Sequence, residues 1–367
     1  MSTLLEQPVT KPKTALTVVD CDIHPTLRSE LDILPFLATR WHDHLKTYRR
    51  HVRQGLHGTL THPRMQVNRI DAVPPDGGPP GSDVDFMRSH HLDANGVEWG
   101  LLQSLSPAAH AERNLEFAAA LAEANNNWQI AKWIDPEPRL RGSIQVQQED
   151  PERAVREIER RANDPRFVQV SLSPRADEPL GRPRYWPIYE VCEKYDLPLG
   201  LHVPGFGSGH ASTAGGWPTF YLEEHQTFAY IIMGVFTSMV IEGVFERFPR
   251  LKVVLVEGGF AWVPALCWRM DRHFDRFRSE VPHLKRKPSE YIKDHIWFTT
   301  QPIEEPERPE DLTKLIDWMG WDRLLFSTDY PHWDFDDPKT AFNVRMSPEK
   351  RRMIFSENAK RVYSRLS

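Results

Sequence analysis

The chain has 367 residues, of which 40% are hydrophobic and 26% are charged, and it contains 12 Trp and 18 Phe. This composition supplies a large apolar core and excludes an extended disordered protein. The net charge of −5 and the pI near 6.4 disfavour nucleic-acid binding, because no excess of basic residues is available to attract phosphates.

Short apolar runs alternate with longer amphipathic stretches along most of the chain, which is typical of βα units around a parallel sheet. The apolar runs predict eight strands, at residues 17–23, 97–104, 140–146, 167–172, 197–203, 252–257, 296–300 and 323–328. The amphipathic stretches predict helices at residues 113–130, 151–162, 188–195, 228–248, 262–277, 310–319 and 348–363. Together they predict an α/β fold, a distorted (β/α)8 TIM barrel that forms a single domain over residues 1–367.

Residues 26–95 depart from this alternation, because they are rich in His, Arg, Pro and Gly and contain the stretch PPDGGPPG. They read as an insertion after the first strand. Loops that follow barrel strands lie over the active-site face, so we expect the insertion to form a lid or a dimer arm. A loop without a functional role is an equally weighted alternative.

The remaining features indicate a cytoplasmic protein without a membrane segment. The longest apolar stretch, residues 231–245, is too short and too often interrupted by polar residues and Gly to span a bilayer. The first 15 residues lack the apolar run of a secretory signal, and the three cysteines have no zinc or redox spacing. We expect a homodimer or another oligomer, with a separate partner subunit as an alternative.

The first predicted strand ends in alternating ionisable residues, Asp20, Asp22 and His24. Period-two geometry points their side chains to one side, into the mouth of the barrel. Buried carboxylates are tolerated when a cation neutralises them. The pattern therefore indicates a metal site, although a helix cap or a surface turn explains a D-x-H motif about as often.

Three more predicted strands end in residues that can bind a metal. His202 ends the strand in LGLHVPG, Asp329 follows the apolar strand in LLFSTDYPHWD, and Glu257 ends the strand in LKVVLVEGG. A buried structural His and a carboxylate at a helix N-terminus are the alternatives for His202 and Glu257. All these residues lie at the carboxyl ends of predicted barrel strands, where barrel enzymes keep their catalytic residues.

The stretches DCDIHP, LHVPG, GVFERFPRLKVVLVEGG and FSTDYPHWDFDDP resemble the amidohydrolase superfamily, specifically the group similar to aminocarboxymuconate-semialdehyde decarboxylase (amidohydrolase family 2). In that family, strand one supplies H-x-H or a carboxylate-x-His pair, strands five and six each supply a His, and strand eight supplies an Asp, around one divalent ion. The resemblance implies Asp22, His24, His202 and Asp329 as metal ligands here.

Two positions differ from that family pattern, because Asp22 replaces the first His of the pair and Glu257 replaces the His of strand six. Carboxylate ligands favour manganese or iron over zinc, so the cofactor is expected to be a divalent Mn, Fe or Zn ion. One ion is expected. Two are conceivable, with Asp20, Glu257 and His225 as additional ligands.

Other polar and aromatic residues are expected around the substrate. His225, in YLEEHQTF, is a candidate ligand or catalytic residue, with a solvated helix-start His as the alternative. His332 and Trp333 follow Asp329 and are candidate substrate contacts, although ordinary packing, the commoner role of aromatic residues, is the alternative for Trp333. The substrate pocket is also expected to draw on the insertion at residues 26–95 and on residues 206–220 and 333–337.

The sequence supports several functions. The first is a metal-dependent hydrolase that acts on a small organic acid or amide through a metal-activated water, with Asp329 as ligand and base and Glu257 and His225 as further catalytic residues. The second is a metal-dependent decarboxylase of a small carboxylic acid, as the family resemblance implies. The third is an oxygen-activating Mn or Fe oxygenase with one or two ions. A structural or regulatory barrel with a stabilising metal is the non-enzyme alternative.

Overall fold

The computed structural model describes residues 17–49, 67–105, 109–203, 216 and 218–366. Residues 50–66 of the predicted insertion lie outside the described residues, as does most of the predicted pocket segment 206–220.

Eight parallel strands form one sheet, in which each strand pairs with the next along the chain. The strands are β1 (Val18–Ile23), β2 (Val97–Leu102), β3 (Leu140–Gln145), β4 (Phe167–Leu172), β5 (Leu199–His202), β6 (Val253–Val256), β7 (Ile296–Thr299) and β8 (Leu324–Leu325). Backbone hydrogen bonds join the segment that follows β8 to β1, from Cys21 N to Phe326 O (3.0 Å) and from Asp329 N to Asp22 O (3.1 Å). The predicted (β/α)8 barrel is therefore confirmed.

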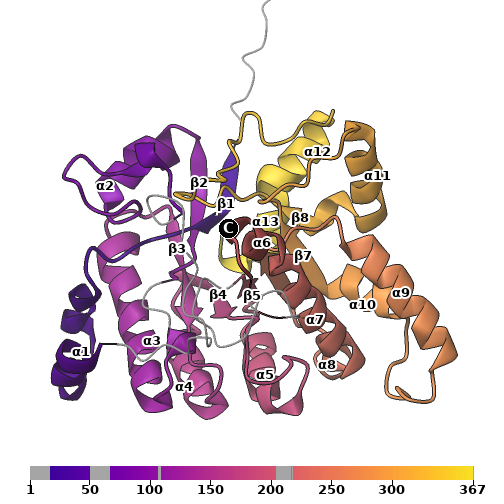
Figure 1. Ribbon diagram of the computed structural model, residues 1–367, viewed down its shortest axis with the longest axis horizontal. Coiled ribbons are helices and arrows are strands. Elements are labelled where there is room, and N and C mark those ends of the chain that lie inside the picture. Colours follow the sequence, from indigo (N-terminus) through magenta and orange to yellow (C-terminus); the bar gives the residue numbers. More distant parts are fainter. Residues whose placement is uncertain (1–16, 50–66, 106–108, 204–215, 217, 367) are drawn as a thin grey trace, which may run out of the picture.

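Helices flank the strands on both sides (Figure 1). In the described ranges the α-helices are α1 (His42–Tyr48), α2 (Val84–Met87), α3 (Leu115–Gln129), α4 (Pro151–Arg161), α5 (Trp186–Lys194), α6 (Tyr221–Gln226), α7 (Phe228–Ile241), α8 (Val244–Arg247), α9 (Val263–Arg276), α10 (Pro288–His295), α11 (Pro309–Met319), α12 (Pro348–Arg352) and α13 (Asn358–Val362). Asn114 and Asp150 cap α3 and α4 by accepting hydrogen bonds from backbone N–H groups of the first turn.

Three predicted elements differ from the structure. The helix predicted at 228–248 is split into α7 and α8, because Gly243 adopts a left-handed conformation with φ 80°. The helix predicted at 348–363 is interrupted by a π-helical turn at Met353–Glu357. β8 has only two residues, and after it Ser327 N donates a hydrogen bond to the hydroxyl of Thr300 (3.1 Å).

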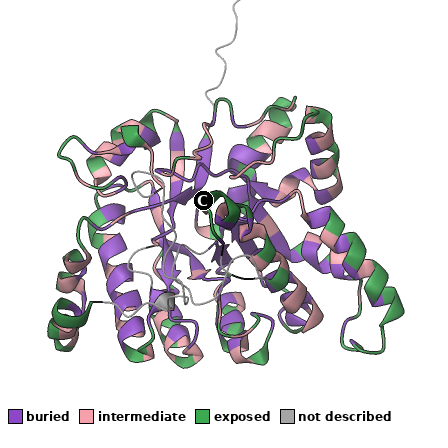
Figure 2. Ribbon diagram, in the orientation of Figure 1, coloured by how far each residue is buried: buried purple, intermediate pink, exposed green. Residues whose placement is uncertain are grey.

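Most apolar side chains form one core between the strands and the helices (Figure 2). A smaller apolar cluster joins inner residues of the strands, including Val19, Val254 and Leu325, to Val362 and Tyr363 at the C-terminal end. Within the described ranges, no helix combines the length and the apolar character needed to cross a bilayer. α7, which contains most of the apolar stretch noted in the sequence, has only 14 residues.

The C-terminal part of the insertion is fastened to the barrel by a buried carboxylate. Glu137, which is 3% exposed, accepts hydrogen bonds from Arg139 (Nε, 2.9 Å, and Nη2, 2.8 Å) and from Arg88 Nε (2.8 Å), and Arg88 belongs to the π-helical turn Arg88–Asp93 of the insertion. The hydrogen bonds from Arg139 are the main reason why the pKa of Glu137 falls from 4.5 to about 2. The role of the insertion as lid or dimer arm stays a prediction.

We expect Glu137→Gln to destabilise the protein at pH 7 but not at pH 2. The depressed pKa means that ionised Glu137 contributes stability above its unfolded pKa near 4.5, and that this contribution is lost as the pH falls towards 2. The difference between these two pKa values limits the stabilisation by Glu137 to roughly 3 kcal/mol, and partial exposure of the arginines reduces it to about 2 kcal/mol. For a chain of this length, that lowers the melting midpoint by roughly 2–3 °C.

Thermal melts of the variant and the native protein between pH 2 and pH 8 would measure this effect. Asp93→Asn is the matched control, because Asp93 contacts the same Arg139 at 2.8 Å but is 57% exposed, and we expect a shift below about 1 °C. Equal shifts for the two variants, or a shift for Glu137→Gln that persists at pH 2, would contradict the assignment.

Candidate metal centre

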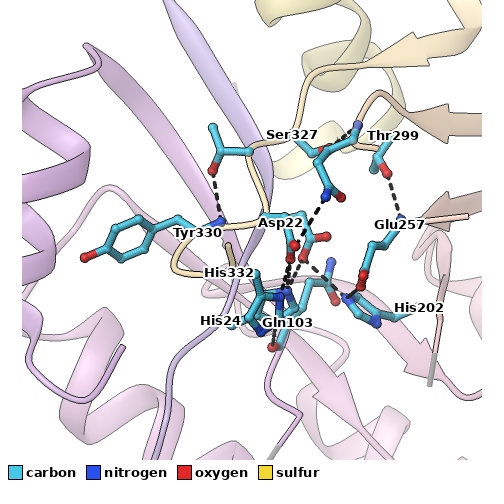
Figure 3. A network of polar contacts seen from close by, with 12 residues as sticks. Asp22, His24, Gln103, His202, Glu257, Thr299, Ser327, Tyr330 and His332 are labelled. Carbon is cyan, nitrogen blue, oxygen red and sulfur yellow. Dashed lines mark hydrogen bonds and ion pairs between the residues drawn. The ribbon is translucent and has the colours of Figure 1, made fainter. Parts of the chain in front are cut away.

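Asp22 and His24 lie at the end of β1 and are almost completely buried. His24 Nε2 is 3.1 Å from Asp22 Oδ1 and 2.7 Å from Asp329 Oδ1 (Figure 3). On its other side, the imidazole is 2.9 Å from the carbonyl oxygen of Gln103, which can only accept a hydrogen bond. Nδ1 therefore carries a proton and Nε2 is the nitrogen that faces the carboxylates.

His202, the last residue of β5, is oriented in the same way. Its Nδ1 is 2.6 Å from the carbonyl oxygen of Val203, and its Nε2 lies 3.5 Å from Asp22 Oδ1 and 3.4 Å from Glu257 Oε2. Both histidines thus use one ring nitrogen to hold the ring in place and direct the other towards the acidic groups. This is the arrangement that metal-binding histidines generally have.

Asp329 follows β8 and adopts a left-handed backbone conformation with φ 63°. Its Oδ1 is 2.7 Å from His332 Nδ1 as well as from His24 Nε2, and its Oδ2 accepts a hydrogen bond from Gln301 Nε2 (3.3 Å). Burial alone would raise the pKa of Asp329, but the charge of His332 and the hydrogen bonds from both histidines outweigh it and hold the pKa well below its usual range. Asp329 is therefore an anion.

Glu257 follows β6 and also has a positive φ, of 60°, with its backbone N–H donating to Thr299 Oγ1 (3.0 Å). Its carboxylate is directed towards His202 (Figure 3). Burial raises the pKa of Glu257 well above the usual value, and the nearby charges of Asp329 and Asp22 add to this effect. An ionised Glu257 thus requires a positive charge in its vicinity.

The buried polar atoms of this cluster fit a divalent ion. Asp22 Oδ1, Asp22 Oδ2 and His202 Nε2 are buried and form no hydrogen bond, although such atoms in protein interiors are nearly always paired. Ligand atoms of Asp22, His24, His202 and Glu257 lie within 4.8 Å of one another, as do those of His24, Asp329 and His332. Two carboxylates and two imidazoles around a common point suit a divalent manganese, iron or zinc ion.

His225 and Trp333 lie at the edge of this cluster. His225, in α6, forms an ion pair with Asp334 (Nε2 to Oδ2, 3.2 Å), and ligand atoms of these two residues and Glu257 form a third group within 4.8 Å. Trp333 is half exposed, packs against the ring of His225 and donates a hydrogen bond to the hydroxyl of Tyr221 (3.0 Å). Its indole is therefore held beside His225, and its contact with the substrate stays a prediction.

Asp20 is not with the other ligands, in contrast to the prediction from strand alternation. The register of β1 shifts between Asp20 and Ile23, so Asp20 and Asp22 do not lie on the same side. Asp20 Oδ2 is instead 2.8 Å from His91 Nε2 and accepts a hydrogen bond from Thr328 Oγ1 (2.6 Å). Its Oδ1 accepts hydrogen bonds from the backbone N–H groups of Asp22 (3.2 Å) and Thr328 (2.9 Å). Asp20 therefore stabilises the backbone conformation of the two segments that carry Asp22 and Asp329.

Four polar residues near the centre were not singled out from the sequence, although His91 and Asp334 lie in segments that were expected to contribute to the substrate pocket. The four are His91, Gln103, Gln301 and Asp334. Gln103 and Gln301 directly follow predicted or observed strand ends, which is a usable signal for residues at the barrel mouth. His91 comes from the insertion and stacks on Tyr330 (4.4 Å between ring centroids), and no local pattern distinguishes it from its neighbour His90.

A family model described as Amidohydrolase matches residues 19–365. Gamma-resorcylate decarboxylase from Polaromonas sp. (strain JS666) is 30% identical over 300 residues, which cover 77% of this chain and 87% of that protein. Among solved structures, 5-carboxyvanillate decarboxylase from Sphingomonas paucimobilis is 23% identical with a TM-score of 0.66, over 95% of this chain and 99% of that one. A dihydroxybenzoic acid decarboxylase from Polaromonas sp. JS666, with bound manganese and 2-nitroresorcinol, is 24% identical with a TM-score of 0.64, over 95% and 97%.

Proposed function

This chain belongs to the amidohydrolase family of metal-dependent enzymes, and we propose that it is a decarboxylase of a small aromatic acid with a hydroxyl group beside its carboxylate. One observation carries the proposal beyond the likeness to gamma-resorcylate decarboxylase. Asp329 lies in the metal-binding cluster and is at the same time hydrogen-bonded to His332, so a proton carrier adjoins the metal site.

We propose that Asp22, His24, His202 and Asp329 hold the ion. Their ligand atoms converge, and the backbone contacts of the two imidazoles fix them in place. A divalent ion bound there would supply positive charge that attracts the carboxylate and the adjacent hydroxyl oxygen of a substrate. The manganese in the related dihydroxybenzoic acid decarboxylase makes Mn²⁺ the first ion to test.

We propose that the Asp329–His332 pair supplies the proton that decarboxylation requires. Decarboxylation breaks the bond between the ring carbon and the carboxylate, leaves the electron pair on the ring carbon and releases carbon dioxide. That carbon then takes up one proton. Because Asp329 is held as an anion, His332 Nδ1 keeps its proton and donates a hydrogen bond to Asp329 Oδ1. We propose that the proton for the ring carbon leaves from Nε2 of the same imidazole, which stacks on His24 and is partly exposed. His332 delivers the proton to the ring carbon of the substrate. Asp329 orients the imidazole and balances its positive charge.

Hydrolysis, the first function considered from the sequence, requires a group that removes a proton from water, whereas two proteins to which the chain is similar, gamma-resorcylate decarboxylase and 5-carboxyvanillate decarboxylase, are decarboxylases. Decarboxylation requires proton delivery instead. We therefore favour decarboxylation, the second function considered from the sequence, over hydrolysis.

A substrate panel tests the proposal directly. We expect the Mn²⁺-loaded protein to release carbon dioxide from 2,6-dihydroxybenzoate or 5-carboxyvanillate, and the product to carry deuterium at the former carboxylate position when the reaction runs in deuterium oxide. Carbon dioxide is measured by gas analysis and the label by NMR. Amide and ester substrates that are hydrolysed while no carboxylic acid is decarboxylated would refute the proposal. Oxygen consumption during turnover would support the oxygenase alternative.

A further inference from the structure

A second group of potential metal ligands lies next to the proposed centre. It comprises His225 of α6, Glu257 at the end of β6 and Asp334 in the segment after β8, and their ligand atoms lie within 4.8 Å of one another. Glu257 also belongs to the group formed with Asp22, His24 and His202. The two groups therefore meet at one carboxylate.

We propose that His225, Glu257 and Asp334 form a second divalent-metal site and that Glu257 is shared between the two ions. This inference goes beyond the proposed decarboxylase function and does not depend on it.

The charges of the buried side chains support a second cation. One divalent ion at the first site balances the negative charges of Asp22 and Asp329. Glu257 and Asp334 then remain as two further carboxylates, and the side chain of Glu257 is nine-tenths buried. The only close polar contact of the Glu257 carboxylate with the described residues is the one with His202 Nε2 at 3.4 Å, which is long for a hydrogen bond. Burying an ionised carboxylate in this way is costly unless a cation is bound to it.

The geometry of the group fits an ion as well. His225 Nε2 and Asp334 Oδ2 are 3.2 Å apart, and two ligand atoms that each lie about 2.1 Å from one metal ion at a right angle are separated by about 3 Å. An ordinary ion pair would account for these two atoms but would leave Glu257 unexplained.

Gln301 connects the two sites. Its Nε2 donates to Asp334 Oδ2 (2.9 Å) and to Asp329 Oδ2 (3.3 Å), so one amide orients a carboxylate of each site. Carboxylates that bind a metal are generally held in orientation by hydrogen bonds of this kind. Asp334 Oδ2 accepts from Gln301 while it faces His225, which leaves Oδ1 as a further ligand atom.

The donor set indicates the class of ion. Two carboxylates and one imidazole favour Mn²⁺ or Fe²⁺, and the absence of thiolate from this group disfavours soft metals. We therefore expect Mn²⁺ and Fe²⁺ to fill both sites.

Elemental analysis tests the inference. The full-length protein is loaded separately with excess Mn²⁺ and, without oxygen, with Fe²⁺, and free metal is removed by desalting. We expect two ions per chain in the native protein and one in Asp334→Asn and in His225→Ala. Asp337→Asn is the matched control and should keep two ions, because Asp337 belongs to neither group and an amide oxygen can still accept the hydrogen bond from Lys339 N.

Electron paramagnetic resonance of the Mn²⁺-loaded protein gives a readout independent of activity. Two ions that share Glu257 should show an exchange-coupled spectrum, and Asp334→Asn should show the six-line spectrum of a single ion. Circular dichroism checks that each variant is folded. If Asp334→Asn does not fold, His225→Ala replaces it in both measurements. One ion per native chain with both metals, or two ions in both variants, would overturn the inference. Carbon dioxide release by a protein with one ion would leave the proposed function intact.

Discussion

Asp329→Asn is expected to lower kcat for carbon dioxide release by roughly 10³-fold while the protein remains folded. Asn has nearly the same shape and can keep the contact with Gln301, but it lacks the negative charge that Asp329 offers to the metal ion and to His332. The variant thus loses a metal ligand and the orientation of the proton carrier together. The effect on kcat is expected to exceed that on KM, because the proton transfer occurs only in the transition state.

The measurement is single-turnover carbon dioxide release at saturating Mn²⁺, with the metal content determined on the same sample. Saturating metal separates weaker metal binding from slower chemistry. Asp322→Asn is the control, since Asp322 is a partly exposed aspartate that precedes β8, at the opposite end of the strand from Asp329, and contacts only Arg323 among the ion pairs of the described chain. This variant should retain native activity. A turnover above a tenth of the native rate in Asp329→Asn would refute both roles assigned to Asp329.

The strands could be predicted because each is a short apolar run between polar segments. The predicted and observed ranges of β4 are identical, residues 167–172, and most other strands differ by one or two residues at an end. β8 differs more, because the chain after Leu325 pairs with β1 through isolated hydrogen bonds rather than a regular ladder. α10 was not predicted, since its segment PSEYIKDH is short and mostly polar and is fixed by contacts of Tyr291 and Ser289 with distant residues.

The candidate ligands on β1, β5, β6 and the segment after β8 were identifiable because the parallel strands of a barrel bring their carboxyl ends to one face. A residue at the carboxyl end of a predicted strand can therefore be placed at this face of the barrel from the sequence alone. No comparable rule applies to His91, which contacts Asp20 across 71 residues, or to the ion pair of His225 with Asp334 across more than 100 residues. Both contacts depend on how loops outside the strands pack, which no local sequence pattern indicates. The register shift between Asp20 and Ile23 could not be predicted from the sequence either.

Removal of the metal is expected to abolish carbon dioxide release and to lower the melting midpoint by about 5 °C. Activity should disappear because the substrate carboxylate then faces Asp22, Glu257 and Asp329 without a cation. An ion present at about 1,000 times its dissociation constant stabilises the folded state by about 4 kcal/mol. The unfolding entropy of a chain of this length, about 0.8 kcal/mol/K, converts that energy into the stated shift.

The experiment compares native protein before chelation, after chelation and desalting, and after re-addition of Mn²⁺, Fe²⁺ or Zn²⁺, with elemental analysis at each stage. Activity is measured well below the lower melting midpoint, so that its loss cannot result from unfolding. The double variant Asp22→Asn/His202→Ala removes two proposed ligands of the first site, so Mn²⁺ should restore neither its activity nor the full shift in its melting midpoint. Full activity in a chelated sample that contains less than about a twentieth of an ion per chain would show that the reaction needs no metal. In that case, another explanation would be required for the buried oxygens of Asp22 and the Nε2 atom of His202, which form no hydrogen bond.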